Sequence, residues 1–267
     1  MRCDNQKIKL FKWSGYIGSI LIEIIEIIFQ AFWLSMLDHN DLNNLTKIGY
    51  VIRSEMYQND EYNTSGFWAW EEKTIERFFY NCKKVLVGAA GGGREVIALS
   101  NRGMHADAFE CNENLVAYSK NLLRKRGIKA EIALSVPDQV PKEYGIYDGI
   151  IMGWGGYTHI HGSKNRIEFL RQCYDHIITD GPLLLSFWQN NGNTKNPLKI
   201  RIANFIRHLR RSKEMIESGD LLDIDGFFHA FKKEEIEKEM NEAGFHLILY
   251  FSEMDVSYAI GRAFNPE

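Results

Sequence analysis

Apolar and polar residues follow two different patterns along this chain, and the pattern changes near residue 83. Before that point, apolar residues recur at helical spacing, which predicts helices over residues 17–37, 41–57 and 68–81, joined by polar turns such as 58–66. After it, short apolar and β-branched runs alternate with helical stretches. Four or five such alternations predict an α/β fold in which helices cover both faces of a parallel sheet.

The predicted strands differ in how they connect. Five of them alternate with helices, at residues 84–89, 105–110, 129–135, 147–154 and 182–188. The last two, 246–253 and 257–264, are separated by too few residues for a parallel crossover, so they should form an antiparallel hairpin. Residues 196–218, which precede that hairpin, are predicted to be a helical insertion.

The apolar stretch at residues 17–37 approaches the length of a membrane span. Glu23, Glu26 and Gln30 interrupt it and fall along one stripe of the helix, which makes the helix amphipathic. Two carboxylates near a bilayer centre cost about 2.5–3.5 kcal/mol each, so we do not expect a spanning helix. Packing on its own domain or on a second copy of the chain is favoured, which leaves a homodimer through this helix open. Association with a membrane surface also stays open, although the polar stripe carries no lysine.

Composition and charge mainly exclude partners. The formal net charge of −3 gives no overall attraction to nucleic acid, so a nucleic-acid partner is not expected. The four cysteines, Cys3, Cys82, Cys111 and Cys173, are far apart and form no metal-ligand spacing with histidine. Together with the lack of a signal-peptide pattern, this predicts a cytoplasmic protein without a bound metal.

A glycine-rich turn at residues 88–93 follows the first predicted strand and precedes a helix. It is not a P-loop, because Arg94 and Glu95 stand where Lys and Ser or Thr are required. It also lacks the third glycine of the dinucleotide fingerprint, since Val96 occupies that position. Glu110 ends the next strand, where a carboxylate can accept hydrogen bonds from both ribose hydroxyls. A bare turn and this acid predict a nucleoside ligand without a pyrophosphate, and S-adenosylmethionine fits that description.

Residues from about 65 to 264 resemble the class I S-adenosylmethionine-dependent methyltransferases. The segments VLVGAAGGG, DAFE, YDGIIMGWGG, GPLLLSFW and AGF…YAIGRA occur in the order and spacing of that family. The resemblance implies a Rossmann-like seven-stranded sheet, parallel with an antiparallel last strand, and S-adenosylmethionine as cofactor. It also implies a methyltransferase domain over residues 65–267 with a helical insertion at about 189–226, preceded by a helical extension over 1–64. Ala89 and Val87 depart from the family, which usually has glycine and a carboxylate there.

The resemblance assigns the cofactor contacts by position. The glycine turn lies against the cofactor, Arg94 pairs with either the methionine carboxylate or Glu95, and Glu110 holds the ribose. Ser135 and Val136 lie at the adenine edge, and Gly153 and Trp154 border the methionine. The full set of expected cofactor residues is Gly88, Ala89, Gly91, Gly93, Arg94, Glu110, Ser135, Val136, Gly153 and Trp154.

Methyl transfer requires alignment of the acceptor, and a base only where the acceptor must lose a proton. His159 is the first candidate for that base, with Tyr157 and His161 beside it in the sequence; the two histidines lack a third metal ligand. Tyr62, Trp70 and His229 are expected to contact the substrate. We therefore expect an enzyme that methylates an O or N atom of a small molecule or short peptide. The alternatives are an RNA or protein methyltransferase that uses basic residues of the insertion, and a non-catalytic scaffold.

Overall fold

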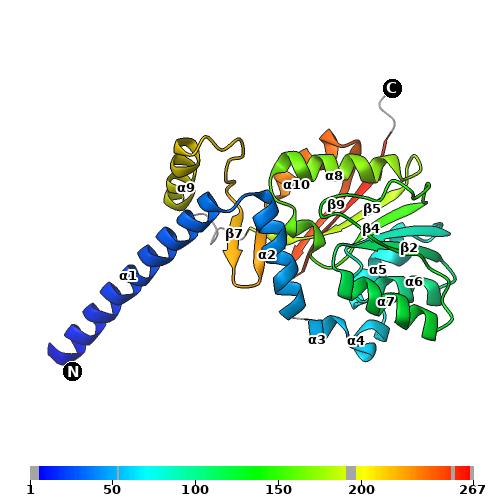
Figure 1. Ribbon diagram of the computed structural model, residues 1–267, viewed down its shortest axis with the longest axis horizontal. Helices are drawn as coiled ribbons and strands as arrows, with labels where there is room; N and C mark the ends of the chain where they lie inside the picture. Colours follow the sequence, from blue (N-terminus) through cyan, green and yellow to red (C-terminus); the bar gives the residue numbers. More distant parts are fainter. Residues whose placement is uncertain (1–5, 53, 191–196, 254–255, 265–267) are drawn as a thin grey trace.

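The computed structural model describes residues 6–52, 54–190, 197–253 and 256–264, and Cys3 lies outside them. A seven-stranded sheet forms its centre, in the strand order β3-β2-β1-β4-β5-β10-β9 (Figure 1). Strands β1 to β5 pair in parallel, and β10 pairs antiparallel with both β5 and β9. The predicted sheet with its antiparallel last strand is therefore confirmed. Its strands are β1 (Lys84–Gly88), β2 (His105–Glu110), β3 (Ile132–Leu134), β4 (Gly149–Met152), β5 (Pro182–Ser186), β9 (Phe245–Glu253) and β10 (Val256–Ala263).

Alternate residues of the central strands supply two hydrophobic cores, one on each face of the sheet. Val85 and Val87 of β1 pack with helices α5, α6 and α7, whereas Leu86 packs with α8 and α10. Burial on both faces explains why β1 is a continuous apolar run. These helices are α5 (Ala69–Phe78), α6 (Arg94–Asn101), α7 (Glu113–Lys125), α8 (Ser163–Asp175) and α10 (Lys233–Glu242).

Strands β1 and β4 are neighbours at the point where the strand order reverses. At such a point the connections that follow the two strands turn to opposite faces of the sheet and leave a crevice between them. The turn 89–93 follows β1, and η1 (Gly156–His159) follows β4. A ligand cleft is therefore expected at the carboxyl ends of β1, β2 and β4.

The described residues of the N-terminal extension form four helices, α1 (Gln6–Met36), α2 (His39–Ile52), α3 (Ser54–Tyr57) and α4 (Asp60–Thr64). The prediction of a turn over residues 58–66 was wrong, because α4 forms there. Asn59 begins α4 by accepting a hydrogen bond from the Tyr62 backbone N–H at 2.8 Å.

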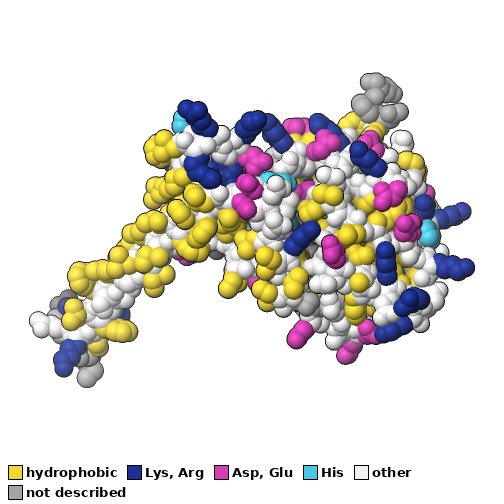
Figure 2. All heavy atoms as spheres, in the orientation of Figure 1, with side chains coloured by type: hydrophobic (Ala, Val, Ile, Leu, Met, Phe, Trp, Pro, Cys, Tyr) yellow, Lys and Arg dark blue, Asp and Glu magenta, His cyan; other side chains and the backbone are white. Residues whose placement is uncertain are grey.

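Helix α1 projects away from the rest of the molecule, and only its last turns are covered (Figure 1). Its buried residues are Ala31, Leu34 and Ser35. Figure 2 shows hydrophobic side chains along the projecting part. The expectation that this helix packs on its own domain holds only for its carboxyl end.

Two arginines of the insertion hold that end of α1. The Arg207 guanidinium donates hydrogen bonds to the carbonyl oxygens of Leu34 and Leu37, and Arg210 donates to those of Ser35 and Met36. Cations suit the unpaired carbonyls at a helix carboxyl end. Part of the basic group of the insertion therefore serves this contact.

The insertion is not purely helical, contrary to the sequence prediction. Besides α9 (Pro197–Leu209) it contains β7 (Asp220–Asp223) and β8 (Gly226–Phe231), an antiparallel pair that forms a small sheet with β6 (Trp188–Gln189). Gly226 has a φ of +142°, and a Cβ there would lie 2.8 Å from Thr46 Oγ1 on α2. A two-residue turn at Ile224 and Asp225, followed by Gly226, thus lets the hairpin pack on α2.

Candidate functional site

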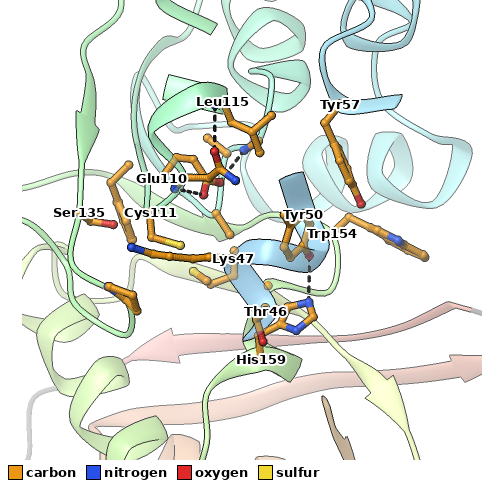
Figure 3. Close-up of a pocket in the computed structure, with 18 of the residues that line it drawn as sticks. Thr46, Lys47, Tyr50, Tyr57, Glu110, Cys111, Leu115, Ser135, Trp154 and His159 are labelled. Atoms are coloured by element: carbon orange, nitrogen blue, oxygen red, sulfur yellow. Dashed lines mark hydrogen bonds between the residues drawn. The ribbon is translucent and has the colours of Figure 1, made fainter. Parts of the chain in front are cut away.

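A cleft opens at the carboxyl ends of β1, β2 and β4, and α2, α3 and α4 form its opposite wall (Figure 3). Its empty volume, including the part open to solvent, is about 1070 Å³. Expected site residues that line it are Ala89, Gly91, Arg94, Glu110, Ser135, Trp154, His159 and Tyr62.

The glycine turn presents bare backbone to this cleft. Gly91 and Gly93 have φ values of +53° and +98°, in the region that favours glycine. A Cβ on Gly91 would meet only Tyr57 Cδ1, at 3.8 Å, whereas a Cβ on Gly92 would lie 2.5 Å from the side-chain amide of Asn63. Gly92 thus permits α4 to pack on the turn, and Gly91 leaves the cleft unobstructed.

Ala89 occupies a conformation that is costly for its side chain. Its φ is +50°, which costs an L-residue about 1–2 kcal/mol. Its carbonyl oxygen would lie 2.5 Å from a Cβ on Gly153, and its own Cβ would lie 2.7 Å from one on Gly156. The β4 end is therefore pressed against the turn. Gly88, Gly93, Val136 and Gly153 are not among the described residues that line the cleft.

Glu110 joins the two strand ends that border the cleft. Its carboxylate accepts hydrogen bonds from the backbone N–H of Gly91 at 3.0 Å and of Asn112 at 2.9 Å. The Cys111 thiol is a third partner, and because a carboxylate has about four lone-pair positions, Glu110 keeps acceptor capacity for a ligand. Burial, followed by the charge of Glu110, raises the pKa of the neighbouring Cys111 thiol to about 12.

Arg94 lines the cleft but already has anionic partners. Its guanidinium binds both carboxylate oxygens of Glu71, at 2.6 and 2.7 Å, and Glu95 at 2.7 Å, and lies over the Trp68 ring. Burial alone would lower the pKa of Arg94, and the charges of Glu95 and Glu71 raise it above its usual value. Of the two expected partners, Glu95 is the one bound, in a buried cluster that also holds Glu71.

His159 lies in the cleft and is oriented by two hydrogen bonds. Its Nδ1 is 2.9 Å from the Phe227 carbonyl oxygen, which can only accept, so the neutral ring carries its proton on Nδ1. Its Nε2 lies 2.9 Å from the Tyr50 hydroxyl, which donates to it in that tautomer (Figure 3). The basic atom of the imidazole is thereby directed toward the cleft wall that α2 supplies.

The two other expected acid–base residues lie outside the cleft. Tyr157 is fully buried, donates a hydrogen bond to Glu239 Oε2 at 2.7 Å and stacks on Phe231. Burial and the charge of Glu239 raise the pKa of Tyr157 well above its usual value. His161 is also buried and its ring packs against Phe227. Neither side chain is among the described lining residues.

The expected substrate residues are separated in space. Tyr62 lines the cleft, and burial raises its pKa to about 12. Trp70 instead stacks on Tyr258 with ring centroids 4.7 Å apart. His229 is fully buried, and its Nδ1 lies 2.7 Å from Asp220 Oδ1. Trp70 and His229 are not among the described residues of the cleft wall.

Sequence reasoning missed the wall formed by α2. Its residues in the cleft share a spacing of i, i+3, i+4 and i+7, which places them on one helix face. This polar stripe within a predicted helix was a usable signal. The stripe consists of Asn43, Thr46, Lys47 and Tyr50, and Tyr57 of α3 lies beyond its end.

No protein-family model matches the chain, and no curated protein matches it in sequence. Solved structures do match. A S-adenosylmethionine-dependent methyltransferase from Methanosarcina mazei is 14% identical, covers 74% of this chain and 99% of its own, and has a TM-score of 0.58.

Two further matches are enzymes of small-molecule chemistry. The 1,6-didemethyltoxoflavin-N1-methyltransferase of Burkholderia thailandensis, with bound 1,6-didemethyltoxoflavin and S-adenosylhomocysteine, is 12% identical and covers 86% of this chain and 92% of its own, with a TM-score of 0.58. An amino pentose methyltransferase from Micromonospora echinaspora is 11% identical and covers 73% and 89%, with a TM-score of 0.53. The chain therefore has the fold of the class I S-adenosylmethionine-dependent methyltransferases, with its cleft where that fold reverses its strand order.

Proposed function

We propose that this protein transfers a methyl group from S-adenosylmethionine to an O or N atom of a small molecule or short peptide. The observation that carries the proposal is the junction of Glu110 with Gly91: a carboxylate with unused lone pairs beside bare backbone, at the carboxyl edge of a methyltransferase-type sheet. The Burkholderia thailandensis structure of the same fold holds S-adenosylhomocysteine. The described residues of the cleft therefore fit the cofactor.

Each end of the cofactor has residues suited to hold it. Glu110 would accept hydrogen bonds from the ribose hydroxyls, and Ser135 lies in the wall beyond β3 where the adenine would lie. Trp154 lies on the opposite side of the cleft from Ser135 (Figure 3), where it would border the methionine. When bound, the cofactor supplies an activated methyl group, so the protein must chiefly align the acceptor and exclude water.

The pair of Tyr50 and His159 is suited to remove a proton from the acceptor. Because Nδ1 of His159 donates to the Phe227 carbonyl, Nε2 is left to accept a proton, either directly or through the Tyr50 hydroxyl. Both residues line the cleft. We therefore propose His159 as the base and Tyr50 as the group that links it to the acceptor.

The acceptor side of the cleft is aromatic and includes the cation of Lys47. Three tyrosine rings lie in a row along this wall. The ring centroids of Tyr50 and Tyr57 are 5.5 Å apart, and those of Tyr57 and Tyr62 are 6.0 Å apart. Lys47 lies on the same helix as Tyr50, one turn earlier. This wall favours a small planar acceptor over RNA, and Arg207 and Arg210, which bind the end of α1, are not free to contact a nucleic acid.

Two measurements test the proposal. Titration calorimetry with S-adenosylhomocysteine should show saturable binding with a dissociation constant below about 1 mM, and no binding would refute the assignment. With a responsive acceptor from a panel, Tyr50→Phe and His159→Gln should each lower kcat at least about tenfold. The control is Tyr80→Phe, an exposed tyrosine far from the cleft. Cofactor binding without turnover on any acceptor would favour the scaffold alternative.

We further propose that the enzyme is cytoplasmic and binds a membrane surface through α1. Among the described residues, α1 is the one helix whose length and composition would allow it to cross a membrane. Glu23 and Glu26 in its middle argue for lying on the surface instead. The helix begins at Gln6, well before the predicted start, and so gains Lys7, Lys9 and Lys12.

These lysines change the prediction made from residues 17–37. They precede the exposed Trp13 and Tyr16, and aromatic and basic residues in this order suit the headgroup region of an anionic membrane. The full chain should float with vesicles of phosphatidylcholine containing about one-third phosphatidylserine, and float less with phosphatidylcholine alone. Replacing Lys7, Lys9 and Lys12 by glutamine should reduce flotation. A stable dimer that does not float would instead assign α1 to a second copy of the chain.

A further inference from the structure

Three potential metal ligands from distant parts of the chain meet beside the cleft. They are His39 at the start of α2, His161 between η1 and α8, and Glu214 in the loop after α9. One ligand atom from each lies within 4.8 Å of the others. Sequence analysis expected no metal because it found no third ligand near His159 and His161, and the fold supplies two from elsewhere.

His161 is the residue that most requires a partner. Its exposed fraction is 1%, and neither ring nitrogen has a hydrogen-bond partner among the described residues. A buried polar group left without a partner costs about 1–3 kcal/mol.

His39 is oriented as metal-binding histidines usually are. Its Nε2 lies 3.1 Å from Asp138 Oδ2, so an Nε2–H can donate to that carboxylate and leave Nδ1 with a lone pair. Nδ1 then accepts a long hydrogen bond, 3.4 Å, from the Asn165 side-chain amide, which a metal ion would replace. A carboxylate on one ring nitrogen fixes the tautomer and makes the other a better ligand.

Glu214 completes the set from a loop that can adjust. Its Oε2 lies 3.6 Å from His161 Nδ1, and its side chain is 43% exposed. The Arg207 guanidinium lies 3.8 Å from the same oxygen but makes its hydrogen bonds to backbone carbonyls, including that of Glu214 itself at 3.1 Å. Arg207 would therefore keep its main partners if the carboxylate turned toward a metal.

We propose that His39, His161 and Glu214 form a binding site for a divalent transition metal, with Zn²⁺ as the best fit. Two imidazoles and one carboxylate, with water in the fourth position, are a ligand set that suits tetrahedral zinc. Zinc-ligand bonds of about 2.0–2.2 Å place the ligand atoms about 3.3 Å apart, whereas here they lie within 4.8 Å of one another, so the side chains must draw together by at most about 1.5 Å. Glu214, whose side chain is 43% exposed, is free to turn toward the two histidines.

A second cluster nearby, formed by Glu217, Asp220 and His229, is less suited to a metal. His229 Nδ1 and Asp220 Oδ1 are already bound to each other at 2.7 Å. Glu217 accepts a hydrogen bond from Arg166 at 2.7 Å, whereas Glu214 is 3.8 Å from Arg207. Glu214 is also 43% exposed, which gives a hydrated ion a route into the first cluster.

Metal at the first cluster would fasten the cleft wall to the insertion. His161 is two residues beyond His159, and Asp138, the partner of His39, lines the cleft. A metal would therefore connect α2, the end of η1 and the loop before β7. We expect the metal ion to have a structural role. The unfolded chain does not contain the site, so the free energy of metal binding adds directly to the free energy of unfolding.

The test uses the full chain, without a polyhistidine tag, after treatment with EDTA. Competition with a chromophoric chelator should show one equivalent of Zn²⁺ bound with a dissociation constant below about 10 µM, and Zn²⁺ should raise Tm. Glu214→Gln and His39→Gln should each weaken binding at least about tenfold and abolish the rise in Tm. His208→Gln, which removes an exposed histidine of the same insertion, should change neither.

Two results would overturn the proposal. One is no uptake of Zn²⁺ at about 100 µM. The other is uptake that Glu214→Gln and His39→Gln leave unchanged while both variants remain folded, because the metal would then lie elsewhere. Since the measurements need neither methyl donor nor acceptor, they stand or fall separately from the proposed methyl transfer.

Discussion

The carboxylate of Glu110 accepts a hydrogen bond from the backbone N–H of Gly91 at 3.0 Å, and this contact joins the end of β2 to the turn after β1. It places the acid and the bare backbone on the same side of the cleft. Glu110 also accepts from the Asn112 N–H at 2.9 Å, so two main-chain donors fix its position, and the Cys111 thiol lies beside it. Both strand ends are thereby fixed in position at the wall where we propose that the nucleoside binds.

Glu110→Gln should weaken S-adenosylhomocysteine binding at least about tenfold, because an amide loses the charge and half of the acceptor capacity. If Glu110→Gln only disturbed the structure of the cleft, it would weaken the binding of all nucleosides equally. The wild-type protein should therefore prefer adenosine to 2′,3′-dideoxyadenosine, and Glu110→Gln should lose that preference. Calorimetry with both nucleosides checks this, and Glu113→Gln, on the exposed start of α7, is the control.

The strands, the antiparallel hairpin and the glycine turn could be predicted because their signals are local. A continuous apolar run such as residues 85–87 indicates a strand that is buried on both faces of the sheet. The glycine turn after the first strand and Glu110 at the end of the second indicate which two strand ends border the ligand. The positions of Gly91 and Glu110 in the cleft needed no distant contact.

The acid–base residues could not be assigned from the same kind of signal. Tyr157 and His159 are two residues apart, yet one faces Glu239 in the core and the other faces Tyr50 in the cleft. That difference depends on the path of η1 and on which helix packs above it. The polar stripe of α2 was visible in the sequence, but only the packing of the insertion against α2 shows what it faces.

Arg94→Lys should destabilise the protein by about 3 kcal/mol, because a lysine cannot bind both Glu71 oxygens and Glu95 together, and those carboxylates are buried. Thermal unfolding should show a fall in Tm of about 6–12 °C. Arg102→Lys, which alters a half-exposed pair with Glu72, should change Tm little.

The same variant tests the role left open for Arg94. Its binding of S-adenosylhomocysteine and of 5′-methylthioadenosine, which lacks the amino-acid end, should change in parallel. A selective loss of S-adenosylhomocysteine binding would instead show that Arg94 holds the methionine carboxylate in addition to Glu71.

Cys111 should react slowly with iodoacetamide although it lines the cleft. Burial and the charge of Glu110 raise its pKa to about 12, so roughly 0.01% of it is thiolate at pH 8. Its rate of alkylation, followed by peptide mass spectrometry, should rise about tenfold for each pH unit up to that value. Glu110→Gln should increase the rate at pH 8, and saturating S-adenosylhomocysteine should reduce it. Rapid alkylation of the wild-type protein at pH 7 would contradict this description of the cleft.

Tyr157→Phe should lower stability and leave kcat nearly unchanged, whereas Tyr50→Phe should do the reverse. The Tyr157 hydroxyl donates to Glu239 at 2.7 Å inside the core, and Glu239 also binds Arg166, so losing the hydroxyl should cost about 1–2 kcal/mol of stability. The phenyl ring keeps its stacking on Phe231, and kcat should remain within about twofold of wild type. Tyr50→Phe should leave Tm nearly unchanged and lower kcat, because its hydroxyl is bound to His159 in the cleft. Measuring Tm and kcat for both variants separates the two roles: a large loss of kcat in Tyr157→Phe would return Tyr157 to the catalytic residues, and an unaltered kcat in Tyr50→Phe would remove Tyr50 from them.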